Sequence, residues 1–446
     1  MLKRLSTTHI IMLSFLAAIL VGAVLLCLPI SSAGGNFTPF IDALFTATTS
    51  TCVTGLVVVP TVSHWSVFGQ IIILLLIQIG GLGIITVISF VAFYLHRKMR
   101  LSDSLLLQDA FNLNSLSGLK SFVKKVIAGS AIIEGVGALI YMTVFIPQFG
   151  ARGIWISIFN SVSAFCNAGI DIIAENSLCN YAANPIINFT TCALIVLGGL
   201  GYIVWWDIAR VAREYKAKRF AHLTLHSKIA LSFTGALIIL GAVAIFIFEY
   251  SNPLTIKDFS LFDKIQASVF QSVTTRTAGF MTLPQENLTN ASSVVSLLLM
   301  FIGGSPVGTA GGVKTVTIAV LFATTLAMVK SKENVTIFGR TLSRQSVSKA
   351  VSVTLISFSI VFISTVLLCA VTNTSLINIL YETVSATATV GLSKGITPSL
   401  NGIGKLIITA TMYLGRVGPI SLVIAFNSKK INRNLIKNPV EEISVG

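Results

Sequence analysis

The sequence predicts an all-α membrane protein made of four tandem repeats, and three observations lead to this prediction. The chain of 446 residues is 54% hydrophobic and only 11% charged, with a mean hydropathy of +0.87, whereas soluble domains are about one quarter charged. Several apolar stretches approach or exceed the ~20 residues that cross a bilayer as a helix. A glycine motif recurs four times in step with these stretches, and basic residues gather in a few of the connections between them.

Eight apolar stretches stand out along the chain. They are Ile10–Pro29, Gln70–Leu95, Val126–Ile146, Phe189–Trp206, Ile229–Phe248, Val294–Ile302, Val351–Val371 and Leu406–Phe426. The first follows Lys3 and Arg4 and resembles a signal peptide in that respect. No small-residue cleavage site follows it directly, however, and similar stretches recur downstream. We therefore interpret it as the first membrane span.

Most of the 31 Lys and Arg residues lie in five segments that span counting places on one side of the membrane. The segments are Lys3–Arg4, Arg97 to Lys125, Arg210 to Lys228, Lys330 to Lys349 and Lys429 to Lys437. Connections rich in Lys and Arg face the cytoplasm, so we expect a multi-pass protein of the cell membrane with both termini cytoplasmic. The net charge of +15 is then explained by membrane topology and does not indicate nucleic-acid binding. The alternative is that these basic residues contact anionic membrane lipid or a cytosolic partner.

The strongest signal is an internal repeat marked by one glycine per unit. Gly55, Gly169, Gly279 and Gly391 are 110 to 114 residues apart, and each follows a short stretch rich in Ser and Thr. Those stretches are Ala43–Ser50, Ser157–Ala164, Ile265–Thr274 and Leu380–Thr387. Each is too short to span the membrane, so we predict a re-entrant half-helix at each position.

A second glycine marker keeps the same phase, 24 to 29 residues after the first. Its members begin at Gly80, Gly198, Gly303 and Gly415. The unit is therefore a span (M1), a pore loop and a second span (M2), used four times in one orientation. The predicted boundaries are 1–100, 101–220, 221–345 and 346–428, followed by a cytoplasmic tail at 429–446. The alternative interpretation of the second marker is close helix packing.

Four pore loops in one chain predict a pseudo-four-fold arrangement around one ion pore. Irregular backbone at membrane depth is tolerated only where protein buries it or where it lines a water-filled cavity. Glycine takes the positive φ angles that turn carbonyls inward, and carbonyl rings replace the hydration shell of a cation. The negative ends of the half-helices would point at that cation. The alternative for the four turn glycines is again helix packing.

With these four units, the chain resembles the superfamily of K⁺ transporters that includes bacterial Trk and Ktr subunits and plant HKT proteins. It is most similar to the Ktr-type, or NtpJ-type, membrane subunit over essentially its whole length, and the Cys-Val-Thr-Gly-Leu of residues 52–56 carries part of this likeness. The resemblance implies a selectivity filter for K⁺ with one glycine per repeat. Its twelve residues would be Val53, Thr54, Gly55, Asn167, Ala168, Gly169, Thr277, Ala278, Gly279, Thr389, Val390 and Gly391. Family members that prefer Na⁺ tend to have Ser at the first glycine, so Gly55 favours K⁺.

A glycine-rich interruption in the third repeat resembles the intramembrane loop that gates these transporters. It comprises Gly303, Gly304, Ser305, Pro306, Val307, Gly308, Thr309, Ala310, Gly311, Gly312 and, after Val313, Lys314. So many Gly and Pro residues do not sustain a straight helix. A Walker A motif is excluded because Val313 separates Gly312 from Lys314 and no strand precedes the segment. A simple kink is the alternative.

Arg416 lies in the middle of the last apolar stretch, where a charge costs roughly 2.5–3.5 kcal/mol on insertion scales. We expect it to face the aqueous pore or a carboxylate. The family has a basic residue below the filter here, which implies an electrostatic barrier in the pore. A structural ion pair is the alternative.

Five further charges have less specific interpretations. Asp42, Asp263 and Glu382 are placed near the outer starts of the half-helices, where a carboxylate caps the positive dipole end or concentrates cations. Glu134 lies inside a predicted span and would pair with another helix or bind a coupling ion. Arg276 is expected behind the third filter segment, outside the ion path.

The sequence therefore predicts K⁺ uptake through a gated pore, with Na⁺ dependence or symport left open, and no enzymatic constellation or cofactor. The resemblance implies a homodimer on a ring of cytosolic nucleotide-binding regulatory subunits. The alternative function is a secondary cation transporter with alternating access, built from repeats and broken helices. Two spans per unit return each turn glycine to the same face, which favours the pore.

Overall fold

The computed structural model describes residues 7–84, 86–87, 119–216 and 222–418, and nearly every element in them is a helix. Four groups of three helices follow one another along the chain. They are α1 (Thr7–Cys27), α2 (Phe40–Thr51) and α4 (Val67–Leu82); α7 (Leu119–Phe149), α8 (Arg152–Cys166) and α9 (Pro185–Leu200); α11 (Leu225–Glu249), α12 (Leu261–Thr274) and α13 (Asn290–Phe301); and α15 (Arg344–Val371), α16 (Leu376–Ala388) and α17 (Gly402–Val417). The all-α prediction is confirmed.

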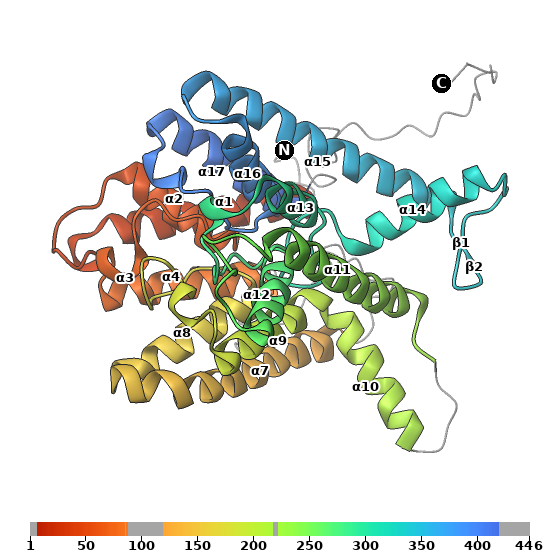
Figure 1. Cartoon of the computed structure of the whole chain (residues 1–446), viewed down its shortest axis with the longest axis horizontal. Coiled ribbons are helices and arrows are strands. Elements are labelled where there is room, and N and C mark those ends of the chain that lie inside the picture. Colours follow the sequence, from red (N-terminus) through yellow and green to blue (C-terminus); the bar gives the residue numbers. More distant parts are fainter. Residues whose placement is uncertain (1–6, 85, 88–118, 217–221, 419–446) are drawn as a thin grey trace, which may run out of the picture.

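The remaining elements lie at the two ends of this bundle. α10 (Tyr202–Lys216), α14 (Thr315–Val329) and the hairpin of β1 (Thr336–Ile337) and β2 (Arg340–Thr341) extend towards one end, whereas α3 (Thr61–His64) lies towards the other (Figure 1). The sequence did not predict the hairpin. Short 3₁₀ turns occur at Pro29–Ser31, Cys179–Tyr181, Gln285–Asn287 and Thr397–Ser399.

Four of the described helices are long and apolar enough to cross a membrane: α1, α7, α11 and α15. These are the first helices of the four groups, and they match the predicted spans beginning at Ile10, Val126, Ile229 and Val351. The bent pair α9 and α10 would count as a fifth span if taken together. The chain is therefore a multi-pass membrane protein. Three repeat boundaries, at 100, 220 and 428, and the tail at 429–446 lie outside the described residues, and the boundary at 345 falls within α15.

The four predicted half-helices correspond to α2, α8, α12 and α16, which have 12 to 15 residues. Their Ser and Thr side chains are mostly buried. In α2, the hydroxyls of Thr46, Thr48 and Ser50 each donate to the carbonyl four residues earlier. This bonding pattern satisfies a hydroxyl inside a helix, which explains how such polar segments lie in the core of the bundle.

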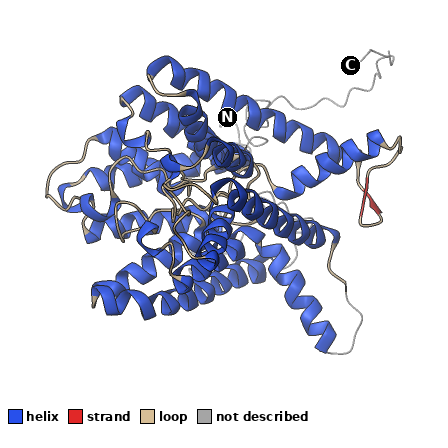
Figure 2. Cartoon of the chain, viewed as in Figure 1, coloured by secondary structure: helices blue, strands red, loops and turns tan. Residues whose placement is uncertain are grey.

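The half-helices are packed in a closed ring by contacts between successive groups. α4 packs on α8, α9 on α12, α13 on α16, and α17 returns to α2. The third helix of each group thus covers the half-helix of the next, and the loops that follow the half-helices gather in the middle (Figure 2). A cyclic contact of this kind places equivalent residues of the four groups around one axis.

The second glycine marker ends helices, which corrects the prediction of continuous second spans. α4, α9 and α17 each stop at a glycine with positive φ, at Gly83, Gly201 and Gly418. α9 and α10 therefore meet at 95°. The apolar stretches continue past these glycines, so hydropathy alone did not reveal the breaks.

The first glycine of the marker does pack closely, as the alternative interpretation held. A Cβ at Gly80, Gly198 or Gly415 would collide with the carbonyl of Thr51, Phe165 or Thr387 respectively. Each of these carbonyls lies four residues before a turn glycine. The third helix of each of these groups can therefore rest directly on the end of its own half-helix only because it has glycine there.

Candidate functional site

The turn glycines of the four repeats meet at the centre of the ring. A Cβ placed on Gly169 would lie 2.5 Å from the carbonyl oxygen of Ala278, and one on Gly279 would lie 2.5 Å from that of Val390. In the same way, a Cβ on Gly55 would collide with the carbonyl oxygen of Ala168, and a Cβ on Gly391 would collide with that of Thr54. Each glycine thus faces the carbonyl that precedes the next glycine around the ring, and no side chain fits between them.

The backbone of these segments alternates in the sign of φ. All four glycines have positive φ, between +64° and +100°, and so do the residues two positions earlier: Val53, Asn167, Thr277 and Thr389, between +51° and +69°. Positive φ is a genuine outlier for β-branched residues such as Val53, Thr277 and Thr389. Strain of this kind persists only where the surroundings impose it, and it clusters at functional sites.

Hydroxyl groups of the half-helices hold this strained backbone. The amide of Gly55 donates to Thr49 Oγ1 at 2.9 Å, and the amide of Gly391 donates to Ser385 Oγ at 3.0 Å. In the second and third repeats, Ser163 and Thr274 instead donate to the carbonyl that follows the glycine, at Ile170 and Phe280. A buried hydroxyl group of the half-helix therefore fixes the backbone at the turn glycine in each repeat, although the backbone atom that it bonds differs.

A cavity of about 290 Å³ opens directly onto the four glycines. Gly55, Gly169, Gly279 and Gly391 form part of its lining, together with residues from the loops that follow each half-helix. Three of these residues are acidic: Asp171, Glu175 and Glu286. No basic residue in the described part of the chain lines this cavity, so its field favours cations. These carboxylates were not predicted from the sequence, because they lie in a loop and a short 3₁₀ turn with no recurrent spacing.

Asp171 is the most enclosed of the three carboxylates. It lies in the loop between α8 and α9, is only 8% exposed, and accepts a bond from the amide of Ile173 at 3.3 Å. Burial raises its pKa to about 6, against the opposing effect of hydrogen bonds that include Ser177. A carboxyl group with this pKa changes its charge close to neutral pH.

The glycine-rich segment between α13 and α14 is an ordered loop and not a simple kink. The two ends of the loop lie next to each other, because the amide of Gly303 donates to the carbonyl of Val313 at 2.9 Å and the amide of Thr315 donates to the carbonyl of Gly304 at 3.0 Å. Ser305 and Thr315 also join their hydroxyls at 3.0 Å. The predicted loop of Gly303–Gly312 and Lys314 is therefore one closed structure.

This loop is docked onto the broken helix of the second repeat. The amides of Ser305 and Thr309 donate to Gly199 and Gly198, and the amide of Tyr202 donates back to Val307. Gly198 and Gly199 end α9, and Tyr202 begins α10. The helix break leaves these backbone groups free of helical partners, and the loop satisfies them.

The other side of the loop lies against the segment that leads to Gly391. A Cβ on Gly311 would collide with the Thr389 hydroxyl and lie 2.7 Å from the carbonyl of Ala388. Thr309 Oγ1 donates to the carbonyl of Phe165, at the end of α8, at 3.1 Å. The loop therefore crosses from the second repeat to the fourth and contacts the residues just before their turn glycines.

Arg416 joins this loop to the first repeat. It is the second-last residue of α17, and its guanidinium donates to the carbonyl of Thr309 at 2.7 Å and to the carbonyl of Gly80. No ion pair of Arg416 occurs within residues 7–84, 86–87, 119–216 and 222–418, so its described partners are carbonyls and not a carboxylate. Lys314 Nζ likewise donates to carbonyls of the loop, at Ala310 (2.5 Å) and Gly311 (3.4 Å).

Arg276 is not among the residues that line the cavity at the turn glycines, and it contacts the base of the same loop. It is 7% exposed, and its guanidinium reaches the carbonyl of Gly303 at 3.3 Å and Thr234 Oγ1 at 3.5 Å. Both bonds are long, and its Nε has no partner in the part of the chain that is described. A buried guanidinium this weakly bonded is costly, which points to a role other than stability.

Two predictions about carboxylates are resolved by their contacts. Glu134 accepts bonds from Gln78 Nε2 at 3.1 and 3.2 Å and thereby joins α7 to α4. Glu382 does not cap a half-helix: it lies in the middle of α16 and accepts bonds from Ser393 and Thr397 in the loop after Gly391. The half-helix begins at Leu376, earlier than the apolar pattern indicated, so Glu382 is too far along it to act as a cap.

The two other carboxylates are in the first turns of their half-helices, as predicted. Asp263 accepts a bond from Ser260, the N-cap of α12, at 2.7 Å. Asp42 lies in the first turn of α2 and pairs with Lys405 of α17 at 2.6 Å. Asp42 therefore has a structural partner in another repeat in addition to its position near the dipole end.

The fold and this axial cluster define a multi-pass membrane protein of the cation-transport class. A family model described as "TrkH: Cation transport protein" matches residues 7–434. The chain belongs to this family.

The relatives agree with the resemblance found in the motifs. The chain is 39% identical to the potassium/sodium uptake protein NtpJ of Enterococcus hirae, covering 100% of this chain and 98% of that protein. It is 38% identical to the Ktr system potassium uptake protein B of Bacillus subtilis, covering 99% and 97%. The crystal structure of the potassium transporter TrkH from Vibrio parahaemolyticus superposes with a TM-score of 0.76 over 96% of this chain and 86% of that one; at 16% identity the likeness is one of fold.

Proposed function

We propose that this protein is the pore subunit of a potassium uptake system in the cell membrane. The observation that carries the proposal is the cyclic meeting of Gly55, Gly169, Gly279 and Gly391, each against a carbonyl of the next repeat. Transport, and not chemical catalysis, is the activity that such a site serves. The names of the relatives, which refer to potassium or potassium/sodium uptake, supply the choice of ion.

In this proposal the four filter segments coordinate dehydrated K⁺ through backbone carbonyls. The twelve predicted residues, Val53 to Gly55, Asn167 to Gly169, Thr277 to Gly279 and Thr389 to Gly391, would supply them. The alternating φ signs support this role, because they turn consecutive carbonyls to one side. The half-helices α2, α8, α12 and α16 end just before the filter, so their negative ends stabilise a cation there. The acidic cavity would concentrate cations at the entrance.

In this proposal the Gly303–Lys314 loop is the gate. Arg416 holds the loop in its closed position through hydrogen bonds and forms an electrostatic barrier in the pore. The loop lies next to the four turn glycines. It is bonded to the second repeat through Gly198 and to the fourth through Arg416, and it packs closely against Thr389. Moving it aside would break these bonds together, which suits a two-state gate. The charge of Arg416 would also repel a K⁺ ion leaving the filter.

We further propose that the chain works as a homodimer on a ring of cytosolic subunits that bind nucleotide. The Ktr system named in one relative supports a separate regulatory subunit. The basic residues of α10 and of the segment from Lys330 to Lys349 lie at one end of the bundle, and the positive-inside rule makes that end cytoplasmic, together with both termini. Na⁺ would act as a second transported or coupling ion.

The arrangement of the repeats favours a pore over alternating access. All four half-helices end at one cluster, so the repeats have one orientation around the axis. Alternating-access transporters with inverted repeats instead rock two opposed halves around a midplane site. Unitary currents in single-channel recordings would support the pore. Their absence, together with strictly coupled stoichiometric flux, would support alternating access.

Growth of a bacterium that lacks K⁺ uptake tests the proposal. We expect the protein, expressed with a nucleotide-binding partner subunit, to restore growth at low K⁺ with and without added Na⁺. Failure of the wild-type protein to restore growth, while it is present in the membrane, would refute the proposal. Dependence of the rescue on Na⁺ would identify the coupling.

A further inference from the structure

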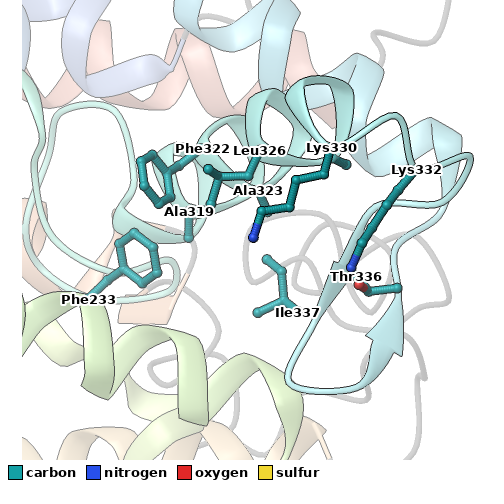
Figure 3. A pocket seen from close by; sticks show the side chains of 10 residues that line it. Phe233, Ala319, Phe322, Ala323, Leu326, Lys330, Lys332, Thr336 and Ile337 are labelled. Carbon is teal, nitrogen blue, oxygen red and sulfur yellow. The ribbon is translucent and has the colours of Figure 1, made fainter.

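A pocket of about 280 Å³ lies at the junction of α11, α14 and the β1–β2 hairpin. Its inner wall is apolar. Phe233 of α11 and Phe322 of α14 approach each other at one end, and Leu326 and Ile337 line the part nearer the hairpin (Figure 3). Because these side chains leave an open space between them, the pocket offers room for an apolar chain.

The opposite end of the pocket is cationic. Lys330 extends from the end of α14 into the middle of the pocket, and Lys332 points towards Thr336 (Figure 3). No acidic side chain lines the pocket, and neither lysine forms an ion pair within the described residues. The mouth therefore combines two unpaired positive charges with one hydroxyl group.

The pocket is at the basic end of the membrane spans. Phe233 is two turns into α11, which begins at Leu225, and Lys330 directly follows α14. The neighbouring surface of α14 is strongly apolar, with Met328 and Val329 exposed by 76% and 77%. An exposed apolar surface next to lysines is typical of the boundary between acyl chains and headgroups.

We propose that this pocket binds one anionic phospholipid of the membrane leaflet. Its phosphate would lie between Lys330 and Lys332, and its acyl chain would pass between Phe233 and Phe322. The charges are complementary, and the cytoplasmic leaflet is the anionic one. α14 begins at Thr315, immediately after the gate loop, so the lipid would hold the helix that leaves the gate. The binding site itself does not depend on the proposed transport function.

The test measures lipid binding by the full-length protein. Native mass spectrometry in nanodiscs would compare phosphatidylglycerol with phosphatidylcholine, for the wild type and for K330Q/K332Q. We expect retained phosphatidylglycerol in the wild type and binding weakened roughly tenfold or more in the double variant. Lys257→Gln combined with Arg152→Gln removes two exposed cations elsewhere and should leave binding unchanged.

A second variant tests the apolar wall. Ala323 lines the pocket, so Ala323→Trp should fill it and release the lipid even though both lysines remain. Equal retention of the two lipids by all variants would overturn the proposal. So would crosslinks from residue 330 to a second copy of the chain or to a cytosolic subunit that persist in anionic membranes, since these would identify a protein as the occupant.

Discussion

Lys405 Nζ lies 2.6 Å from Asp42 Oδ1 and thereby joins the last repeat of the chain to the first. The two residues are 363 positions apart, and their helices, α17 and α2, form the contact that closes the ring of half-helices. Each side chain is 16% exposed, so the pair is intermediate between a surface and a buried ion pair. It holds together the two repeats that no peptide segment connects.

Removing one partner should therefore loosen the ring. Exposed pairs contribute about 0–1 kcal/mol and loss of a buried partner costs about 3–5 kcal/mol, so we expect Asp42→Asn or Lys405→Gln to destabilise the protein by about 1–3 kcal/mol. Thermal unfolding in detergent would measure it, with the exposed Lys257→Gln as a control. A double-mutant cycle that gives no coupling between Asp42 and Lys405 would contradict this role.

Gly55→Ser should impair K⁺ selection. A Cβ at this position collides with the carbonyl of Ala168, and the φ of +100° is one that L-residues rarely adopt. Strain of about 1–3 kcal/mol would be relieved by displacing the filter backbone, so apparent K⁺ affinity should fall roughly tenfold. Rubidium uptake with Na⁺ as competitor would measure the change.

The matched control is Gly235→Ser on α11, where an added Cβ meets nothing within 4 Å. That variant should transport like the wild type. If Gly55→Ser also behaved like the wild type, the filter assignment would be lost, although the family and the transport class would stand.

The sequence predicted the features that recur and missed those that depend on distant contacts. The four half-helices and Gly55, Gly169, Gly279 and Gly391 were visible because one period repeats them. The positive φ of Val53, Thr277 and Thr389 was not, because local preference opposes it in β-branched residues and only the surrounding ring imposes it.

Helix ends and polar partners were predicted less well for a related reason. The apolar stretches continue past Gly83, Gly201 and Gly418, so a hydropathy pattern cannot show that the helices stop there. The carbonyl partners of Arg416 belong to residues more than a hundred positions away, and no pattern along the chain encodes that distance.

Arg416→Gln should open the gate loop. The substitution removes donors to Thr309 and Gly80 and the positive charge beside the proposed ion path. Hydrogen bonds from a charged donor contribute about 1.5–3 kcal/mol each, so the loop should leave its closed position more often. We expect a higher maximal rubidium uptake rate and a lower KM, with Arg416→Lys intermediate. Loss of the protein from the membrane in Arg416→Gln, but not in Arg416→Lys, would instead indicate a purely structural role.

Arg276→Met should separate stability from gating. Arg276 is 7% exposed and has only long bonds, to Gly303 and Thr234. Replacing a poorly satisfied buried charge by an apolar side chain of similar length is often neutral or stabilising, so the melting temperature should not fall. The loop would lose its anchor at Gly303, and we expect uptake that no longer responds to the regulatory subunit. A large fall in melting temperature together with unchanged regulation would contradict this.

Transport should weaken as the outer pH falls through the titration of Asp171. This carboxylate lines the cavity at the four turn glycines, where burial raises its pKa to about 6. Above that pH it is negative and attracts K⁺; below it, protonation removes the charge and leaves Glu175 and Glu286 as the acidic residues of the lining. The KM for rubidium should therefore rise as the pH falls from 7.5 to 5.5, roughly along the titration curve of a single carboxyl group. Asp171→Asn should have the higher KM at both pH values and lose most of the pH dependence, whereas Asp258→Asn, on the exposed loop after α11, should behave like the wild type. An unchanged pH profile in Asp171→Asn would assign the titration to another group.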